Sequence, residues 1–323
     1  MIAGILLVAA TGVAMVRLAF TAPSDSPGGV VMLRAGRGAG GVARDLHRAG
    51  IIGNRVAFVA FARLTGADRD LRAGRYRIPP AQSLRELIAL LRKGPNLVER
   101  VTIVEGSRAD QIAGLLSAAV GVDSSDFMRI VLDPASSERF VTPGPTLEGY
   151  LFPNTYELQW GASAEDVIST LVREYRKAII PFAARAESLR MSEREIVTLA
   201  SIVEAETGLP EERPRVAAVF HNRLREEWKL EADPTVRYAS GNQSGGITRA
   251  DLEFDSPYNS YLYRGLPPGP IGNPGKESIV AALYPDEACD DFFFVATGSG
   301  GHYFSRTLAE HNAAKARARR IAN

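Results

Sequence analysis

The stretch MSEREIVTLASIVEAETGLP, residues 191–210, predicts a helix that ends with two glutamates close together. Ser192 followed three residues later by Glu195 is the pattern of a capping box, in which each residue satisfies a backbone amide of the other. Gly208 and Pro210 are typical of a helix end. The pattern therefore predicts a helix between this serine and this glycine.

One face of this helix is apolar except for a single carboxylate. Ile196, Leu199 and Val203 recur at steps of three and four residues, and Glu206 continues the same stripe. Burial disfavours the charged form of a carboxyl group, and so does the negative end of the helix dipole. Both effects predict a raised pKa for Glu206, which suits a general acid. Glu204, near the edge of the same face, is the other candidate for the general acid. The structural alternative is that Glu206 is only a salt-bridged glutamate at a helix end.

The segments around this helix predict a mixed α+β domain. Proline and glycine cluster at 143–145, which marks a boundary, so we expect a second domain over 143–323. Its predicted elements are helices at 164–179, 192–207 and 214–225, a strand at 292–296 and a basic C-terminal helix.

The N-terminal half shows a weak internal repeat of strand, glycine turn and two helices. Ser83, with Glu86 three residues on, makes a second capping box. Such units suit small carbohydrate-binding modules, and an ordinary α+β support domain is the alternative. We assign this region to 30–142, after a turn-forming linker at 23–29. The predicted strands lie at 30–33, 71–78 and 101–104, and the second helix of each repeat lies at 55–64 and 124–131.

The first 22 residues, MIAGILLVAATGVAMVRLAFTA, are almost wholly apolar. A stretch of about 20 apolar residues has the length of one membrane crossing. We therefore expect residues 1–22 to be a transmembrane anchor. A cleaved signal peptide is the alternative, although the stretch is longer than a typical signal core and no clean cleavage site follows it.

Charge and composition exclude several classes of function. The 38 basic and 37 acidic residues leave a net charge of +1, which gives no electrostatic reason to expect nucleic acid as a partner. The single cysteine, Cys289, cannot form an internal disulfide and is expected to be a half-buried apolar residue. The four histidines lack the spacing of a zinc site, so we expect neither a metal nor a cofactor.

Six ordered stretches carry a resemblance to a known family. Together they identify the chain as similar to the MltG/YceG-like endolytic murein transglycosylases over nearly its whole length. One stretch alone would be weak evidence, but agreement of all six by chance is negligible. The stretches are LEGYLFPNTY (147–156), LASIVEAET (199–207), VAAVFHNRL (216–224), LEADPTVRYA (230–239), SPYNSYLYRGLPPGPIGNPG (256–275) and GGHYFSRTLAEHN (300–312).

The resemblance implies that a glutamate of the VEAET stretch is catalytic. We carry this role to Glu206 and keep Glu204 in reserve. The implied reaction cleaves the MurNAc–GlcNAc bond without water. The carboxyl protonates the leaving oxygen and then takes a proton from the substrate's own C6 hydroxyl, which attacks C1 and leaves a 1,6-anhydro end. Glu148, in LEGYLFP, is a less favoured candidate for a second acid.

Substrate contacts are expected on the segments that follow the helix. Tyr258, Asn259 and Tyr261 supply aromatic faces and an amide, which sugar sites favour. Five further residues could also contact substrate, and three of them have a structural role as the alternative. The aspartate could cap a helix, the arginine could form an ion pair, and the histidine could be a hydrogen-bonded structural residue. These further residues are Asn222, Arg223, Asp233, Asn273 and His302.

The resemblance also implies a LysM-like subdomain within 30–142 and a catalytic domain over 143–323. It implies a single-pass protein of the bacterial cytoplasmic (inner) membrane with the catalytic domain on the periplasmic or extracytoplasmic side. The implied partners are peptidoglycan glycan strands, the membrane, penicillin-binding proteins, and the elongation or division machinery. The enzyme would act there as a terminator of glycan elongation. Two alternatives stay open: a non-catalytic peptidoglycan-binding scaffold, and a muramidase that hydrolyses with water.

Overall fold

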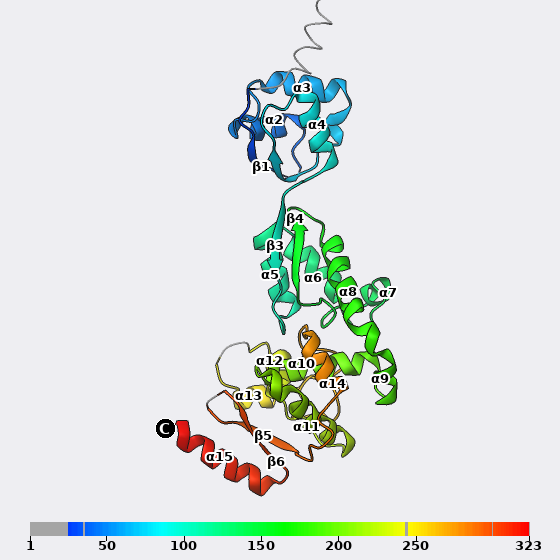
Figure 1. The fold of residues 1–323 in the computed structure, drawn as a ribbon, viewed down its shortest axis with the longest axis vertical. Coiled ribbons are helices and arrows are strands. Elements are labelled where there is room, and N and C mark those ends of the chain that lie inside the picture. The colour runs from blue at the N-terminus through cyan, green and yellow to red at the C-terminus, as the bar shows by residue number, and fades with distance from the viewer. Residues whose placement is uncertain (1–24, 35, 243–244, 299, 323) are drawn as a thin grey trace, which may run out of the picture. The chain divides into compact units, whose positions relative to one another are not determined.

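The computed structural model describes residues 25–34, 36–242, 245–298 and 300–322 of the 323-residue chain. The predicted anchor at 1–22 lies outside these residues, and within them no helix is long and apolar enough to cross a membrane. The described chain forms two compact units (Figure 1). Unit 1 holds the residues up to Val101 together with Ala118–Val122 and Glu157–Ala162, and unit 2 holds the rest.

Unit 1 is built around one antiparallel strand pair covered by helices. Strand β1 pairs with β2 so that Val31 lies opposite Tyr76, and both side chains are buried in the core. The predicted capping box is confirmed, because Ser83 and Glu86 each satisfy the other's backbone amide. The elements are β1 (Gly29–Leu33), α2 (Ala39–Arg48), α3 (Arg55–Leu64), η1 (Ala67–Arg69), β2 (Gly74–Ile78), α4 (Leu84–Lys93) and most of β3 (Val98–Thr102).

Unit 2 is mainly helical. The helix predicted within residues 191–210 is its helix α10. Helix α10 packs against α14, α11 and α12, and its neighbours surround it in Figure 1. The remaining elements of the described chain are α5 (Ala109–Val120), α6 (Ser124–Leu132), α7 (Pro134–Arg139), β4 (Thr155–Gln159), α8 (Ala164–Ile179), η2 (Ile180–Phe182), α9 (Ala183–Ser188), α10 (Glu193–Glu206), η3 (Pro210–Glu212), α11 (Arg213–Arg225), α12 (Asp233–Ser240), α13 (Arg249–Leu252), α14 (Lys276–Leu283), β5 (Phe293–Ala296), β6 (His302–Ser305) and α15 (Leu308–Ala322).

Each sheet of the described chain has two strands. Strand β3 pairs with β4, and β5 pairs with β6 in antiparallel register, with Phe293 opposite Ser305. Helix α15 packs against the second of these pairs. The described chain thus combines many helices with three small sheets rather than one large sheet. The predicted α+β class is confirmed.

The predicted helices agree closely with those observed. The bounds predicted for α3 and α8 are those of the structure, and the predicted helix at 214–225 lies within α11. Helices α12 and α14 and strand β6 were among the elements not predicted, because segments of eight, eight and four residues are too short to show a clear periodic pattern.

The compact units do not divide where the predicted domains do. The main division falls between Val101 and Thr102, whereas the sequence placed a boundary at 143. Contacts among residues 102–117 and 123–156 therefore belong to the unit that contains α10. The functional limits of the linker, the LysM-like region and the catalytic domain stay predictions.

Candidate active site

Helix α10 forms as its sequence indicates. Glu195 accepts a hydrogen bond from the backbone amide of Ser192 at 2.7 Å, and the serine hydroxyl accepts one from the amide of Glu195 at 3.3 Å. At the other end, Thr207 takes an extended backbone and ends the helix. The capping box and the predicted range are confirmed. The apolar stripe that precedes Glu206, made of Ile196, Leu199 and Val203, is fully buried.

Glu206 lies half-buried at the end of this stripe. Among the described residues, no hydrogen bond or ion pair engages its carboxyl group. The pKa of Glu206 is raised to about 8 from its ordinary value of 4.5, mainly by burial and then by the nearby Asp233 carboxylate, while Arg223 opposes the shift. The predicted upward shift is confirmed, and desolvation is its main cause. Glu206 therefore holds its proton at neutral pH, and no hydrogen-bond partner within the described ranges fixes its position.

Glu204 is placed very differently. One of its oxygens accepts a hydrogen bond from Arg213 at 3.0 Å, and the other accepts one from the backbone amide of Gly275 at 2.9 Å. Its side chain is 7% exposed, as is that of Arg213. Arg213 also forms ion pairs with Glu277 at 2.6 Å and Glu105 at 3.6 Å. Both oxygens of Glu204 thus hold α10 to α11 and to the start of α14, which leaves Glu206 as the free carboxyl of the pair.

Asp233 stands close enough to Glu206 to act on its charge. It is the first residue of α12, but it makes no side-chain cap, so the helix-cap alternative for this residue is wrong. Its carboxylate instead accepts a hydrogen bond from the hydroxyl of Tyr261 at 2.7 Å. Burial and this carboxylate raise the pKa of Tyr261, so the phenol remains a donor. Sequence reasoning named both residues without linking them to each other.

Arg223 supports the same region from α11. Its guanidinium donates hydrogen bonds to the carbonyl oxygens of Phe292 at 2.7 Å and Leu230 at 2.6 Å, and it lies 3.8 Å from Glu231. Burial lowers the pKa of Arg223, against the effect of Glu231. The ion-pair alternative is therefore present, and the arginine also supplies positive charge near Glu206.

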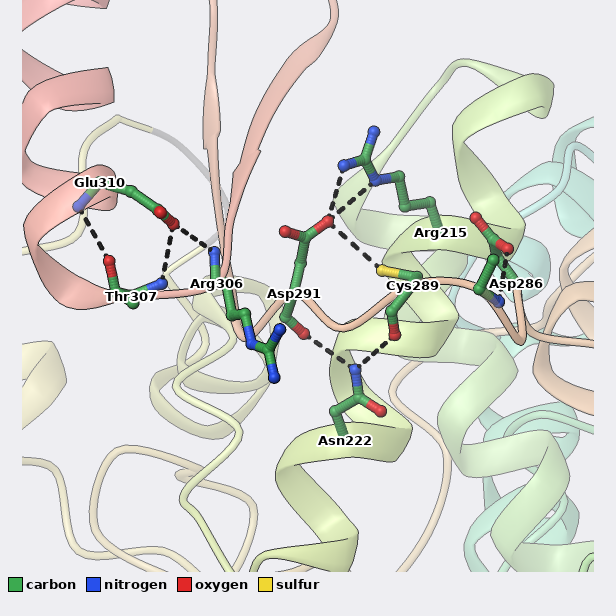
Figure 2. Close-up of polar contacts among 9 residues, drawn as sticks. Arg215, Asn222, Asp286, Cys289, Asp291, Arg306, Thr307 and Glu310 are labelled. Carbon is green, nitrogen blue, oxygen red and sulfur yellow. Dashed lines mark hydrogen bonds and ion pairs between the residues drawn. The ribbon is translucent and has the colours of Figure 1, made fainter.

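The three asparagines named from the sequence are engaged within the protein. The amide of Asn222 donates to the carbonyls of Cys289 at 2.9 Å and Asp291 at 3.0 Å, as Figure 2 shows. Asn259 donates to two carbonyls in the chain just before it, at 3.0 and 2.9 Å. Asn273 is considered below with Glu148. Contacts of these amides with substrate stay a prediction, and the structure gives each a role in fixing a loop.

Glu148 and Asn273 form a buried link between distant segments. Glu148 accepts hydrogen bonds from the backbone amide of Ala109 at 3.1 Å and from the amide side chain of Asn273 at 2.8 Å. Asn273 also donates to the carbonyl of Ser107 and accepts from the amide of Leu151, each at 2.8 Å. Burial raises the pKa of Glu148 to about 7, although these hydrogen bonds oppose the shift. We therefore assign Glu148 to the framework of the site.

The Glu148→Gln variant should lose part of the pH dependence of stability. The folded-state pKa lies above the ordinary value of 4.5, so the folded protein keeps a proton that the unfolded chain releases. The free energy of unfolding of the wild type should therefore fall as the pH rises from about 4.5 to 7. In the variant the slope of this fall should be smaller by the equivalent of about one bound proton. Urea unfolding across this range measures the slope. Glu310→Gln is the control, since that exposed carboxylate also accepts two backbone amides but has a lowered pKa. Equal slopes in wild type and Glu148→Gln would contradict the assignment.

Tyr258 and His302 each contact another side chain of unit 2. The ring of Tyr258 packs at 5.0 Å from that of Tyr238, and it is only half-buried. His302 pairs through Nδ1 with Glu212 at 2.6 Å, and its backbone amide donates to the same carboxylate at 2.9 Å. Thr207 lies 3.5 Å from Glu212. His302 therefore has a structural partner in Glu212, which also contacts Thr207, and substrate contacts of Tyr258 and His302 stay a prediction.

Two features of this region were missed from the sequence. Arg213 has no local signal, because its carboxylate partners lie on other elements. Trp228 is an exposed aromatic residue in a charged loop, which was a visible signal. A pocket of about 530 Å³ is lined by Arg194 and Thr198 from the first half of α10 and by His221 from α11. Glu206 does not line it. Concavity alone therefore does not identify the site.

Comparison with known proteins shows the family of this chain. Residues 31–317 match the model of the YceG-like family. A Bacillus subtilis (strain 168) protein named "Endolytic murein transglycosylase" is 32% identical over 305 residues, which covers 88% of this chain and 83% of that protein. A protein of the same name from Streptococcus pneumoniae (strain D39) is 28% identical, and the match covers 84% of this chain and 55% of that protein.

A solved structure is similar over almost the whole described fold. The crystal structure of a YceG-like protein from Listeria monocytogenes is 33% identical, with a TM-score of 0.62, and the match covers 89% of this chain and 99% of that one. Because the family model spans most of the sequence and the Bacillus protein is similar over most of both lengths, this chain belongs to the YceG-like family.

Proposed function

We propose that this protein is an endolytic peptidoglycan lytic transglycosylase whose acid and base is Glu206. The observation that carries the proposal is a carboxyl with a pKa of about 8, without a hydrogen-bond partner in the described chain, beside the paired Asp233 and Tyr261. The relatives named endolytic murein transglycosylase support the choice of substrate. The bond we propose to be cleaved joins MurNAc to GlcNAc in a glycan strand.

The proposed reaction needs one carboxyl group and no water. Protonated Glu206 gives its proton to the glycosidic oxygen as the C1–O bond breaks, and the positive charge develops on the sugar ring. The carboxylate then takes the proton of the C6 hydroxyl, whose oxygen bonds to C1. The products are a 1,6-anhydroMurNAc end and a free GlcNAc hydroxyl, and Glu206 recovers its proton. The hydroxyl reacts readily because it is held within the same sugar.

Asp233 supports both steps in this proposal. Its negative charge helps to keep Glu206 protonated before cleavage, and it would stabilise the positive ring in the transition state. Tyr261 holds the carboxylate in place through its 2.7 Å hydrogen bond. Arg223 opposes the charge of Asp233 and keeps the pKa of Glu206 from rising further. Glu204 takes no part in the chemistry because its oxygens are occupied by Arg213 and Gly275.

Hydrolysis is the second candidate, because Asp233 supplies the other carboxylate that glycoside hydrolases ordinarily use. Mass spectrometry of purified glycan strands after digestion separates the possibilities. Internal fragments with anhydro ends support the proposal. Reducing MurNAc ends would mean hydrolysis, and strands left intact by the wild-type protein would mean a non-catalytic scaffold.

We further propose the cellular setting that the family resemblance implies. Residues 1–22 would anchor the chain in the bacterial cytoplasmic membrane, and unit 2 would act outside it on nascent strands. A LysM-like region within 30–142 would hold the strand, and penicillin-binding proteins would supply it. Fractionation of cells, followed by protease digestion of spheroplasts, tests the orientation, since an extracytoplasmic unit 2 should be cleaved in intact spheroplasts.

The pH dependence of cleavage provides a direct test of the role of Asp233. The active form needs protonated Glu206, so kcat/KM should be level below about pH 7 and fall by about tenfold per unit well above the pKa of about 8. Asp233→Asn removes a negative charge that raises this pKa, so the fall should begin at a lower pH. Asp255→Asn is the matched control, because Asp255 also accepts a tyrosine hydroxyl, that of Tyr263 at 2.6 Å, but does not act on Glu206. A profile of Asp233→Asn that matches the control would exclude this role.

A further inference from the structure

Three aromatic side chains form an exposed platform on unit 2, here called the aromatic ledge: Trp228, Phe292 and Phe293. The ring of Trp228 lies 5.0 Å from that of Phe292 and 5.9 Å from that of Phe293. Trp228 is 44% exposed, and both phenylalanines are partly exposed. Leaving so much aromatic surface in water is unfavourable, which is the usual mark of a surface that binds something.

The ledge is held rigidly from beneath. The backbone amide of Trp228 donates to the carbonyl of Arg223 at 2.8 Å, which fixes the loop after α11. His311 stacks on Phe293 at 5.0 Å and 23° between ring planes, and the Arg223 guanidinium lies 5.4 Å from the centre of the same ring. A platform that is already ordered binds a flat partner with little loss of side-chain freedom.

The chain that leads into the ledge is also anchored. Figure 2 shows Asn222 bonded to the carbonyls of Cys289 and Asp291, just before Phe292. Arg215 holds the Asp291 carboxylate at 2.7 Å, and the Cys289 thiol donates to that carboxylate at 3.4 Å. The position of the two phenylalanines therefore does not depend on Trp228.

The ledge is continuous with the proposed catalytic site through Arg223. This side chain donates to the carbonyl of Phe292 at 2.7 Å, and its charge acts on the carboxyl of Glu206. Arg223 also donates to the carbonyl of Leu230 at 2.6 Å, three residues before Asp233, so one arginine links the ledge to the chain that enters the proposed site. An endolytic enzyme must hold a polymer on both sides of the bond that it cuts, so an ordered surface next to the acid lies where such a strand would run.

The chemistry of the ledge favours a sugar over a membrane. Aromatic rings stack on the C–H faces of pyranoses, and such contacts need no fixed charge in the ligand. Exposed carboxylates flank Trp228 at Glu226, Glu227 and Glu231, with Lys229 the only base between them. Arg225 pairs with Glu226 and Arg223 pairs with Glu231, each at 3.8 Å, so this loop offers no excess of positive charge that would attract an anionic lipid surface.

We propose that the aromatic ledge is a distal subsite for one pyranose ring of the glycan strand, beyond the two sugars whose bond is cut. The inference rests on the proposed function, since it takes glycan as the ligand. The ledge then favours long strands over short ones, because only a strand long enough to reach Trp228 gains the stacking contact.

The test compares Trp228→Ala and Trp228→Tyr with wild type on glycan strands freed of stem peptides and separated by length. For Trp228→Ala, kcat/KM on long strands should fall by about tenfold, mainly through KM, and the loss should shrink on the shortest strands that are cleaved. Trp228→Tyr should recover part of the loss. Tyr284→Ala is the control, because that ring is 46% exposed and packs on Phe182 and Arg185 instead.

Binding measured in the inactive Glu206→Gln background separates this proposal from the proposed function. Weaker binding of long strands when Trp228→Ala is added, with an unchanged melting temperature, supports the ledge whatever the reaction products are. Binding equal to that of Glu206→Gln alone overturns it. A loss confined to vesicles of phosphatidylglycerol and phosphatidylethanolamine would overturn it in favour of a membrane contact.

Discussion

Replacing Glu206 with glutamine is expected to lower kcat for glycan cleavage by about a thousandfold or more, because the amide can neither donate the first proton nor accept the second. The same change should leave the fold intact. Glu206 makes no hydrogen bond or ion pair within the described chain, and burial already disfavours its charged form. Rates come from the release of anhydro-ended fragments with time, and stability comes from urea unfolding at pH 7.

Glu204→Gln is the matched control, since it makes the same chemical change two residues away on the same helix. Here we expect the opposite pair of results. Stability should fall, because the Glu204 carboxylate accepts hydrogen bonds from Arg213 and from Gly275. Activity should persist in the fraction that stays folded. Full loss of cleavage by a well-folded Glu204→Gln, with activity retained by Glu206→Gln, would reverse the assignment.

The largest effect on stability is expected from Arg213→Met. This change leaves the carboxylate of Glu204 buried without its cationic partner, and breaking such a pair typically costs about 3–5 kcal/mol. That is a large share of the roughly 5–15 kcal/mol by which domains are stable. Urea unfolding of the protein, monitored by tryptophan fluorescence, measures the loss of stability.

Two further variants make this expectation specific. Arg215→Met, two residues along α11, removes an arginine that is 47% exposed and pairs with Asp291 at the surface, so it should cost about 1 kcal/mol or less. The double variant Arg213→Met with Glu204→Gln should recover part of the loss, because the buried charge is then gone. A cost for Arg213→Met no larger than for Arg215→Met would show that the buried pair does not hold the site together.

The elements that the sequence predicted well are those defined by local patterns. Ser192 and Glu195 lie three residues apart, so one turn of helix contains the whole capping signal, and the observed hydrogen bonds follow it. The amphipathic spacing that ends at Glu206 is likewise a property of one helix. It was enough to predict a buried stripe and the direction in which the pKa of its carboxyl moves.

The partners of these residues could not be predicted in the same way. A helical pattern gives the face of a residue, but not what lies opposite. The sequence placed Glu206 on the apolar stripe and Glu204 near its edge, but it did not show that Arg213 and Gly275 occupy the oxygens of Glu204. The bond between Glu148 and Asn273 joins residues 125 positions apart, and Tyr261 reaches Asp233 across 28. Such contacts depend on tertiary packing rather than on local propensity.

The aromatic ledge shows the same limit. Each of its residues was visible in the sequence, but Trp228 lies in the loop after α11, and Phe292 directly precedes β5, far along the chain. Their 5.0 Å contact appears only when both segments are folded. Asp233 illustrates the converse, because a local pattern suggested a helix cap and the folded chain instead paired it with Tyr261.

The most direct test of the central claim is a measurement of the pKa of Glu206 itself. Protein labelled with ¹³C at the glutamate carboxyls is titrated by NMR, and the resonance missing from Glu206→Gln is assigned to this residue. A midpoint near 8, as burial and Asp233 require, would establish a protonated acid at neutral pH. A midpoint near the ordinary value of 4.5 would contradict the proposed role of Glu206.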